Sequence, residues 1–297
     1  LGGYGFSDGA GKGVMGVSSA DGLELSVYRQ VRDIGDVPVI APLFNSIASQ
    51  EFGDDYGDYY RATGARFSVR STLGARGEWR FITTSEQVAS LAVRATPATG
   101  QYRPNPSLGD GTFTTTALTV RRRSQGFAVR RDVAGEATAE VGGHFGRFSG
   151  VGHLLVPLGT SRLLTRIQVG IGTRDLPRHR AFVLGGRGTL LGDGFREWCG
   201  RRVALVHVEW RTSIPFLRLR AGPARTPGTI TLAPYVASGW ADEPLLLSPW
   251  RVTAGTRITL GLAAEWLGVF RLEAGYGVQS RRMRVAFDVT RDFWDIL

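Results

Sequence analysis

The stretch GGRGTLLGDGFREWCG, residues 185–200, is the part of the chain whose composition most resembles a ligand-binding loop. Glycine-rich loops cradle phosphate groups when a Gly-Lys-Ser/Thr sequence leads directly into a helix. This stretch contains no lysine, and no helical pattern follows it. We therefore interpret its glycines as positions that let a loop turn tightly and lie against a crowded wall. No cofactor and no cofactor-binding residue is predicted.

The sequence gives equally little evidence for a catalytic site or for a site built on cysteine. Ser149, His153 and Asp132 have the residue types of a hydrolytic set, but no motif surrounds them, and a structural histidine is the simpler interpretation. Cys199 is the only cysteine, which excludes an internal disulfide and a cysteine-based metal site. The sequence therefore predicts no catalytic residue, no metal site and no enzyme activity.

Two long segments have the composition of surface loops. The segment 33–60 includes EFGDDYGDYY at residues 51–60, where Asp54, Asp55 and Asp58 have a spacing that fits no calcium-loop template. The segment 94–110 is rich in proline, glycine and polar residues. We interpret both segments as solvated excursions between regular elements.

The net charge of +10 comes from 36 Lys and Arg residues against 26 Asp and Glu residues. A basic chain can bind nucleic acid or an anionic lipid surface. Here the arginines recur singly along alternating segments, and RRR at 121–123 is the densest run. Because no recognition motif accompanies the charge, nucleic-acid binding is not predicted.

Period-2 alternation of apolar and polar residues, which is typical of β-strands, runs through most of the chain. Ile167, Val169 and Ile171 share one face of such a segment, and no run approaches the 18 apolar residues of a membrane-spanning helix. The pattern predicts about 14 strands, near residues 1–7, 12–19, 22–31, 61–72, 76–88, 111–123, 132–142, 147–158, 163–173, 201–213, 228–240, 255–267, 268–279 and 281–293.

Alternation alone does not say which face of each strand is buried. In a soluble sandwich the apolar face points to the core, whereas in a membrane barrel it points to lipid. Long strands, unequal connections and aromatic residues near strand ends, such as Trp210, Tyr235 and Trp240, favour the barrel. The sequence predicts an all-β fold, an antiparallel transmembrane β-barrel of about 14–16 strands formed by residues 1–297 as one domain. A soluble β-sandwich or β-solenoid is the alternative.

In a barrel, the charged residues on the polar strand faces would point into the lumen. They could line a conducting pore or pair with one another in a plugged lumen, and we favour the plugged state. The predicted lumen-facing charges are Arg166, Glu209, Arg211, Arg257, Glu265, Arg271 and Glu273, together with Arg284.

The segment FVLGGRGTLLGDGFREWCGRRVALVHVEWR, residues 182–211, resembles the bacterial surface antigen family, the BamA/TamA-like barrels of outer membranes. In that family a strand leads into a glycine-rich loop that folds back into the lumen. The next strand ends in an acidic residue followed by an aromatic residue, as VHVEWR does here. The resemblance is firm over about residues 160–297 and implies a bacterial outer-membrane location. The loop residues it implies are Gly185, Gly186, Arg187, Gly188, Leu190, Leu191 and Gly192.

The resemblance also extends to the C-terminal strand. It implies that this strand is recognised by the barrel-assembly machinery and pairs with the first strand to close the barrel. The residues concerned are Met283, Val285, Phe287, Val289, Phe293 and Trp294.

Two positions depart from the family pattern. The family's loop arginine aligns with Leu191, and its acidic partner aligns with Ala237. A buried charge without its partner costs several kcal/mol, so joint loss of both is physically coherent. Arg187 could supply a substitute pair with Glu209, and we state this as a hypothesis.

Several functions follow from this interpretation. The resemblance implies protein insertion or translocation, with outer-membrane lipid, the assembly machinery and client polypeptides as partners. Family barrels have 16 strands, and many carry periplasmic modules that deliver substrate polypeptides. The sequence predicts about 14 strands and no such module, which weakens the translocation role. The chain could therefore also be a passive or plugged pore, or a membrane anchor for an N-terminal domain. A soluble β-sandwich binding protein is the alternative from a different class.

Overall fold

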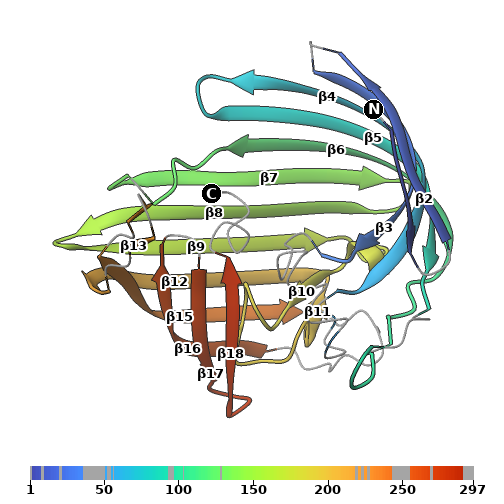
Figure 1. Cartoon of the computed structure of the whole chain (residues 1–297). Coiled ribbons are helices and arrows are strands. Elements are labelled where there is room, and N and C mark those ends of the chain that lie inside the picture. Colours follow the sequence, from blue (N-terminus) through green and yellow to red (C-terminus); the bar gives the residue numbers. More distant parts are fainter. Residues whose placement is uncertain are drawn as a thin grey trace.

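Most of the described strands form one large antiparallel sheet, and two short strand pairs lie outside it. The computed structural model describes residues 2–7, 10–19, 22–35, 51, 55, 57–92, 97–102, 104–127, 129–217, 220–221, 224–225, 228–242, 255–267 and 270–289. Fourteen strands pair in chain order to make this sheet (Figure 1). They are β1 (Gly2–Ser7), β2 (Ala10–Ser18), β3 (Leu23–Asp33), β4 (Tyr59–Leu73), β5 (Gly77–Ser90), β6 (Gly111–Arg122), β7 (Asp132–Gly142), β8 (Gly146–Leu158), β9 (Ser161–Gly172), β12 (Arg202–Pro215), β15 (Thr229–Asp242), β16 (Gly255–Trp266), β17 (Phe270–Gly277) and β18 (Arg282–Val289).

The prediction of an all-β antiparallel fold with about 14 strands is therefore confirmed. Each predicted strand lies within a few residues of an observed one. None of the described residues forms a helix that is long and apolar enough to cross a membrane.

Burial settles which face of each strand points outward. On β9, Ile167 and Ile171 are 48% and 57% exposed, whereas the neighbouring Arg166 is 2% exposed. The same inversion occurs on β17, where Leu272 is 52% exposed and Arg271 is fully buried. A soluble sandwich would bury the apolar set and expose the charges, so this sheet has the orientation of a membrane barrel.

The outward face includes most of the predicted aromatic residues. Trp210 and Trp240 are partly exposed among aliphatic neighbours, as expected for residues at a membrane interface. Tyr235 is a correction, because it is buried on the inner face, where its ring stacks on His207 with 4.7 Å between centroids.

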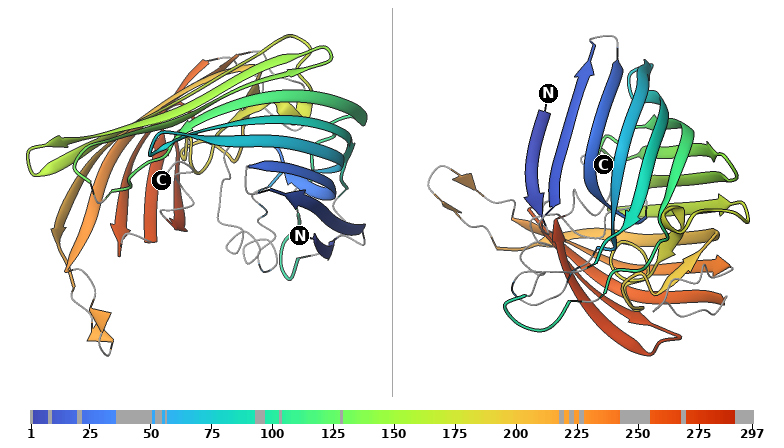
Figure 2. Two further views of the ribbon diagram at one scale, coloured as in Figure 1. Left: turned by 90° about the horizontal axis from the view of Figure 1, so that it is seen from above. Right: turned by 90° about the vertical axis from the view of Figure 1, so that its right-hand side faces the viewer.

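The sheet is curled, and β1 and β18 are the two ends of its pairing order (Figure 2). The predicted pairing of the first and last strands is not among the ladders that the described residues form. Residues 290–297 lie outside the described part of the chain, so closure through the whole C-terminal strand stays a prediction.

The connections at the two rims differ in length. Residues 34–58, 91–110 and 173–201 are long connections at one rim, whereas residues 74–76 and 159–160 are tight turns at the other. The hairpin of β13 (Arg220–Ala221) and β14 (Ala224–Arg225) belongs to the second rim. Short turns on one side and long loops on the other are typical of outer-membrane barrels.

Candidate functional site

The connection from β9 to β12 folds onto the concave side of the sheet and forms the centre of the candidate site. It contains the single turn η1 (Arg178–Arg180) and the short strands β10 (Phe182–Leu184) and β11 (Trp198–Gly200), which pair with each other. The alternation of apolar and polar residues does not predict β10 and β11, because three residues are too few to show a period. All seven predicted loop residues are buried between these strands.

The glycines make the tight turn of this infolded loop possible. Gly185, Gly186 and Gly188 have φ values of 114°, 81° and 76°, a region that residues with a Cβ rarely occupy. The amide of Gly186 donates to the carbonyl of Leu190 at 2.9 Å, and the amide of Arg196 donates to the carbonyl of Gly185 at 3.0 Å. The loop is therefore a compact folded unit.

One side of the loop packs on the wall formed by β15, β16 and β17, which we call the C-terminal wall. Leu190 is fully buried in an apolar cluster with Ala237, and it lies directly over Gly239. Leu191 packs next to Gly275. Leu191 and Ala237, the positions that depart from the family pattern, are both buried apolar residues, with Leu191 beside Gly275 and Ala237 in the cluster with Leu190.

Gly192 approaches this wall most closely. A Cβ at this position would lie 2.1 Å from the backbone nitrogen of Gly277, so a side chain would force the loop away. The Gly192 amide donates to Thr259 Oγ1 at 3.3 Å, and its carbonyl accepts from Ser280 Oγ at 2.9 Å. The backbone of the loop is therefore bonded to β16 and to the turn between β17 and β18.

The other side of the loop is held by ion pairs at the start of the sheet. Arg196 Nη1 lies 2.7 Å from Asp33 Oδ1 and 3.2 Å from Asp58 Oδ2, and Arg196 Nη2 also binds Asp33. Asp33 is the last residue of β3, and Asp58 directly precedes β4. We call the part of the sheet formed by β3 and β4, with Asp58, the N-terminal wall. Burial alone would lower the pKa of Arg196, but the two carboxylates raise it above its ordinary value.

These contacts correct two interpretations of the sequence. Asp58 is fully buried and paired, whereas the sequence predicted a solvated acidic loop. Asp54 lies outside the described residues, and Asp55 accepts a hydrogen bond from the hydroxyl of Tyr59. No pattern in the sequence predicts a role for Arg196.

The predicted pair between Arg187 and Glu209 does not form within the described part of the chain. Arg187 Nη2 donates instead to the backbone carbonyl of Phe287 on β18. Glu209 is bound by three other residues, His207, Arg211 and Arg271. The loop thus contacts the last strand of the sheet through a backbone acceptor.

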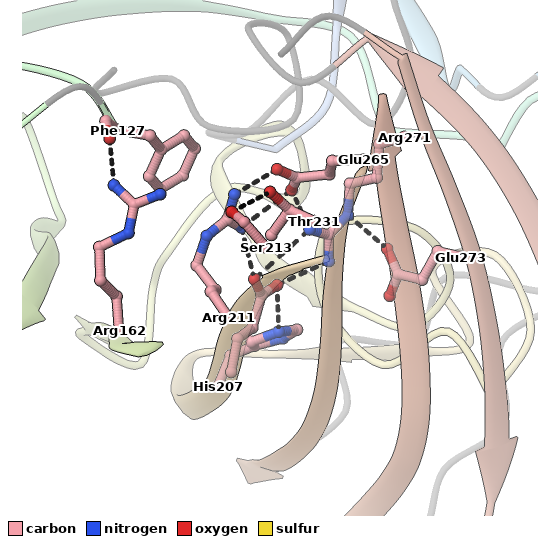
Figure 3. A network of polar contacts seen from close by, with 10 residues as sticks. Phe127, Arg162, His207, Arg211, Ser213, Thr231, Glu265, Arg271 and Glu273 are labelled. Carbon is pink, nitrogen blue, oxygen red and sulfur yellow. Dashed lines mark hydrogen bonds and ion pairs between the residues drawn. The ribbon is translucent and has the colours of Figure 1, made fainter. Parts of the chain in front are cut away.

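Glu209 belongs to a buried network of charges on the C-terminal wall and the adjoining β12 (Figure 3). Arg271 is its centre, with Nη2 2.6 Å from Glu209, Nη1 2.7 Å from Glu265 and Nε 3.2 Å from Glu273. Arg211 binds both Glu209 and Glu265 from the other side. Five of the seven predicted lumen charges therefore lie together in this network, which also includes His207.

The two remaining predicted charges contact the infolded loop. Arg166 Nη1 donates to the Gly188 carbonyl at 2.8 Å, and the Arg257 guanidinium lies 3.9 Å from the ring centroid of Trp198. Arg284 is the register partner of the buried Gly275, so it lies on the inner face of β18, where its side chain is exposed.

A second connection reaches the lumen from the opposite rim. The Phe127 carbonyl accepts from Arg162, and the Phe127 ring lies 3.9 Å from the Arg211 guanidinium (Figure 3). Asp132 holds this β6–β7 connection through Ser124 and the Gln125 amide. The sequence does not predict this contact, because an isolated phenylalanine in a polar turn has no periodic signal.

The candidate hydrolytic set is dispersed. His153 Nε2 lies 3.4 Å from Asp132 Oδ2, but Ser149 is four residues away along β8, about 13 Å at the rise of a strand. Asp132 is occupied by Arg76 and Ser124 as well. His153 therefore belongs to an anchor for the β6–β7 connection.

Two side chains of the infolded connection have strongly shifted pKa values. Burial, together with Arg180, Arg32 and Arg147, lowers the pKa of His179 to about 3. Its Nε2 has no hydrogen-bond partner among the described residues. Burial raises the pKa of the Cys199 thiol to about 12, so this thiol is protonated and shielded while the loop is in place.

The described part of the predicted C-terminal assembly strand faces outward. Met283, Val285 and Phe287 are exposed, and the Phe287 ring stacks on Phe270 with 6.0 Å between centroids. The Val289 side chain, Phe293 and Trp294 lie outside the described residues.

Comparison with known proteins relates this fold to outer-membrane barrels. No family model and no curated protein matches the sequence. The structure is similar to BamA from Haemophilus ducreyi lacking POTRA domains 1–3, with a TM-score of 0.58, 9% sequence identity, and coverage of 94% of this chain and 61% of that chain. It is also similar to CdiB from Acinetobacter baumannii, with a TM-score of 0.50, 13% identity, and coverage of 94% and 49%. The chain thus spans about half to three fifths of the length of these proteins, and the likeness shows their barrel fold.

Proposed function

We propose that this chain, which has the fold of the BamA and CdiB barrels, is a bacterial outer-membrane protein that inserts or translocates client polypeptides. The observation that carries the proposal is the pair of sheet ends, β1 and β18, which are not joined in the described residues. A strand edge presents unpaired backbone donors and acceptors, which are costly in lipid. A strand of a client can satisfy them by adding to the edge.

The filled lumen supports this function over that of a wide passive pore. The infolded loop occupies the concave side, and the charges that would line a pore are paired with one another or with the loop. We propose no catalytic role, because the candidate serine lies far from His153 along the same strand.

A tether across the sheet ends tests the proposal. In a Cys199→Ser background, cysteine pairs would be screened that join Gly3 or Gly5 of β1 to Arg284 or Ala286 of β18. The protein would be reconstituted in vesicles, and the folding rate of a small outer-membrane barrel would be followed by its heat-modifiable mobility on gels. We expect the reduced protein to accelerate client folding and the oxidised tether to abolish the acceleration.

A disulfide within the sheet is the matched control. Tyr276 and Met283 are register partners of β17 and β18 on the outward face, so a Tyr276→Cys/Met283→Cys disulfide leaves the sheet ends free. This control should stay active in both redox states. Equal client folding by the oxidised and reduced tether would contradict the proposal, and a large steady conductance in planar bilayers would favour the passive pore.

A further inference from the structure

A groove of about 710 Å³ lies where the turn between β4 and β5 meets the adjoining ends of β6 and β7. Leu73, Val120 and Val133, which line it, are 51%, 44% and 49% exposed on the outward face of the sheet. The register places Gly77, Arg122 and Gly135 side by side across β5, β6 and β7. The outward lining is therefore aliphatic, with one arginine at its margin.

Three small residues belong to the outward lining of this groove. Gly77 and Gly135 flank Arg122 on the neighbouring strands, and Ala137 is the register partner of Val120. In a membrane barrel an aliphatic furrow on the outward face lies in lipid, where it fits a hydrocarbon chain. Its shape alone does not select among lipids, so selection must come from the charges at its end.

Exposed arginines gather at this end of the groove. Arg122, Arg123, Arg130 and Arg131 all lie in or beside the connection from β6 to β7 and are exposed. Arg123 is paired with Glu78, and the Nε of Arg122 donates to the Val133 carbonyl at 3.0 Å, which orients its guanidinium along the groove margin. In the described part of the chain, Arg130 and Arg131 form no ion pair, and the adjacent Asp132 is turned inward to Arg76 and Ser124.

We propose that this groove binds an anionic phospholipid, with an acyl chain over Val120 and Val133 and the phosphate group on Arg122 and Arg131. The proposal rests on the outer-membrane location proposed above. The rim concerned carries the tight turns at residues 74–76 and 159–160, which is typical of the periplasmic side. Arginine binds phosphate oxygens through two parallel N–H donors, which favours it at such a headgroup.

Competitive lipid binding tests the site directly. Full-length protein in detergent would be mixed with equal amounts of phosphatidylglycerol and phosphatidylcholine of the same acyl chains, and the retained lipid would be counted by native mass spectrometry. We expect at least a fivefold preference for phosphatidylglycerol in the wild type. The Arg122→Gln/Arg131→Gln variant should lose the preference, and Ala137→Phe, which fills the groove, should retain less of both lipids.

The control removes the same number of arginines from the opposite rim. Arg202 and Arg282 are exposed at the starts of β12 and β18, and Arg202→Gln/Arg282→Gln should keep the preference. Any of three results would overturn the proposal. The wild type could retain the two lipids equally, Arg122→Gln/Arg131→Gln could keep the preference for phosphatidylglycerol, or Ala137→Phe could retain as much lipid as the wild type. Complete displacement by inorganic phosphate would show a phosphate site without a lipid.

The result can be separated from the proposed client function. Insertion into vesicles and the client-folding rate would be measured for Arg122→Gln/Arg131→Gln and for Ala137→Phe, and both should match the wild type because these side chains lie away from β1 and β18. Failure of the wild type to insert would overturn the outer-membrane proposal. Normal insertion with no lipid preference would overturn only the lipid site.

Discussion

The infolded loop meets two walls of the sheet, and the two contacts differ in where their charges come from. On the C-terminal wall and the adjoining β12, Arg211 and Arg271 neutralise the buried glutamates, and the loop adds apolar and backbone contacts through Leu190 and Gly192. On the N-terminal wall, the loop itself supplies the cation, Arg196, for Asp33 and Asp58. The comparison teaches that the first wall supplies the arginines for its own glutamates, whereas the second wall takes its cation from the loop.

Arg271→Met should have the largest effect, because it leaves Glu209, Glu265 and Glu273 with one fewer buried cation. Breaking a buried ion pair costs about 3–5 kcal/mol, and we expect a loss of that size in the free energy of unfolding. Urea titration in vesicles, followed by tryptophan fluorescence, measures it. Arg202→Met is the control, since the exposed pair with Asp242 should contribute at most about 1 kcal/mol.

The same variant also tests whether the wall is independent of the loop. Cys199 is the only cysteine and is buried against the N-terminal wall, so its labelling by a maleimide reports loop release. Below the urea transition, Cys199 should stay protected in Arg271→Met. Labelling in the still-folded variant would show that the two contacts are coupled and would break the comparison.

Arg196→Met should cost slightly less, about 3 kcal/mol, because Asp58 is left buried without its cation while Asp33 is partly exposed to water. Unlike the previous variant, it should release the loop locally. We expect Cys199 to become reactive while the sheet stays folded. Adding Asp58→Asn should recover part of the stability, and full protection of Cys199 in Arg196→Met would contradict the role given to this clamp.

The contrast between the walls also explains what the sequence could and could not predict. The strands were predictable, because long period-2 segments such as β9 carry a repeated signal in neighbouring residues. The charges of the C-terminal wall were predictable as inward-facing for the same reason. Which of them would pair was not, since Glu209 and Arg271 are 62 residues apart and on strands that are not adjacent.

The N-terminal contact left almost no trace in the sequence. Arg196 and Asp33 are separated by 163 residues, and neither belongs to an alternating pattern that would assign it a face. The family resemblance directed attention to Leu191 and Arg187 as the places for a loop charge. The cation that the loop uses is a few residues further on, in a stretch whose conformation depends on packing against both walls.

Leu190→Ala should cost about 2–3 kcal/mol, which is in the lower part of the range for a buried leucine because the loop can relax into the space. The physical cause is lost packing on Gly239 and Ala237, with no charge exposed. Urea titration measures the loss. The control is Leu262→Ala, whose side chain is half exposed on the outward face and should matter less. A larger loss than for Arg196→Met would reverse the ranking of the two contacts.

The smallest expected effect is the change in the free energy of unfolding with pH. It concerns His179, which lies on the side of the loop that faces the N-terminal wall. The pKa of His179 is lowered to about 3 in the folded protein by burial and by three arginines, against 6.5 when it is exposed. A depressed pKa of a base means that only the unfolded state takes up the proton below pH 6.5, so stability is complete above that value and falls as the pH drops. At pH 6.5 half of the unfolded molecules already carry this proton, so we expect a loss of about 1 kcal/mol between pH 6.5 and 5.5.

His179→Phe, which keeps an aromatic ring beside Tyr60 and Phe113, should remove this part of the pH dependence. His144→Gln is the control, because His144 is exposed in the turn between β7 and β8 and its replacement should leave the dependence intact. Parallel urea titrations at the two pH values decide the matter. If His179→Phe lost stability on acidification as steeply as the wild type, His179 would not be the group whose protonation destabilises the folded protein. The group responsible for the pH dependence would then lie outside the charged contact between the loop and the N-terminal wall.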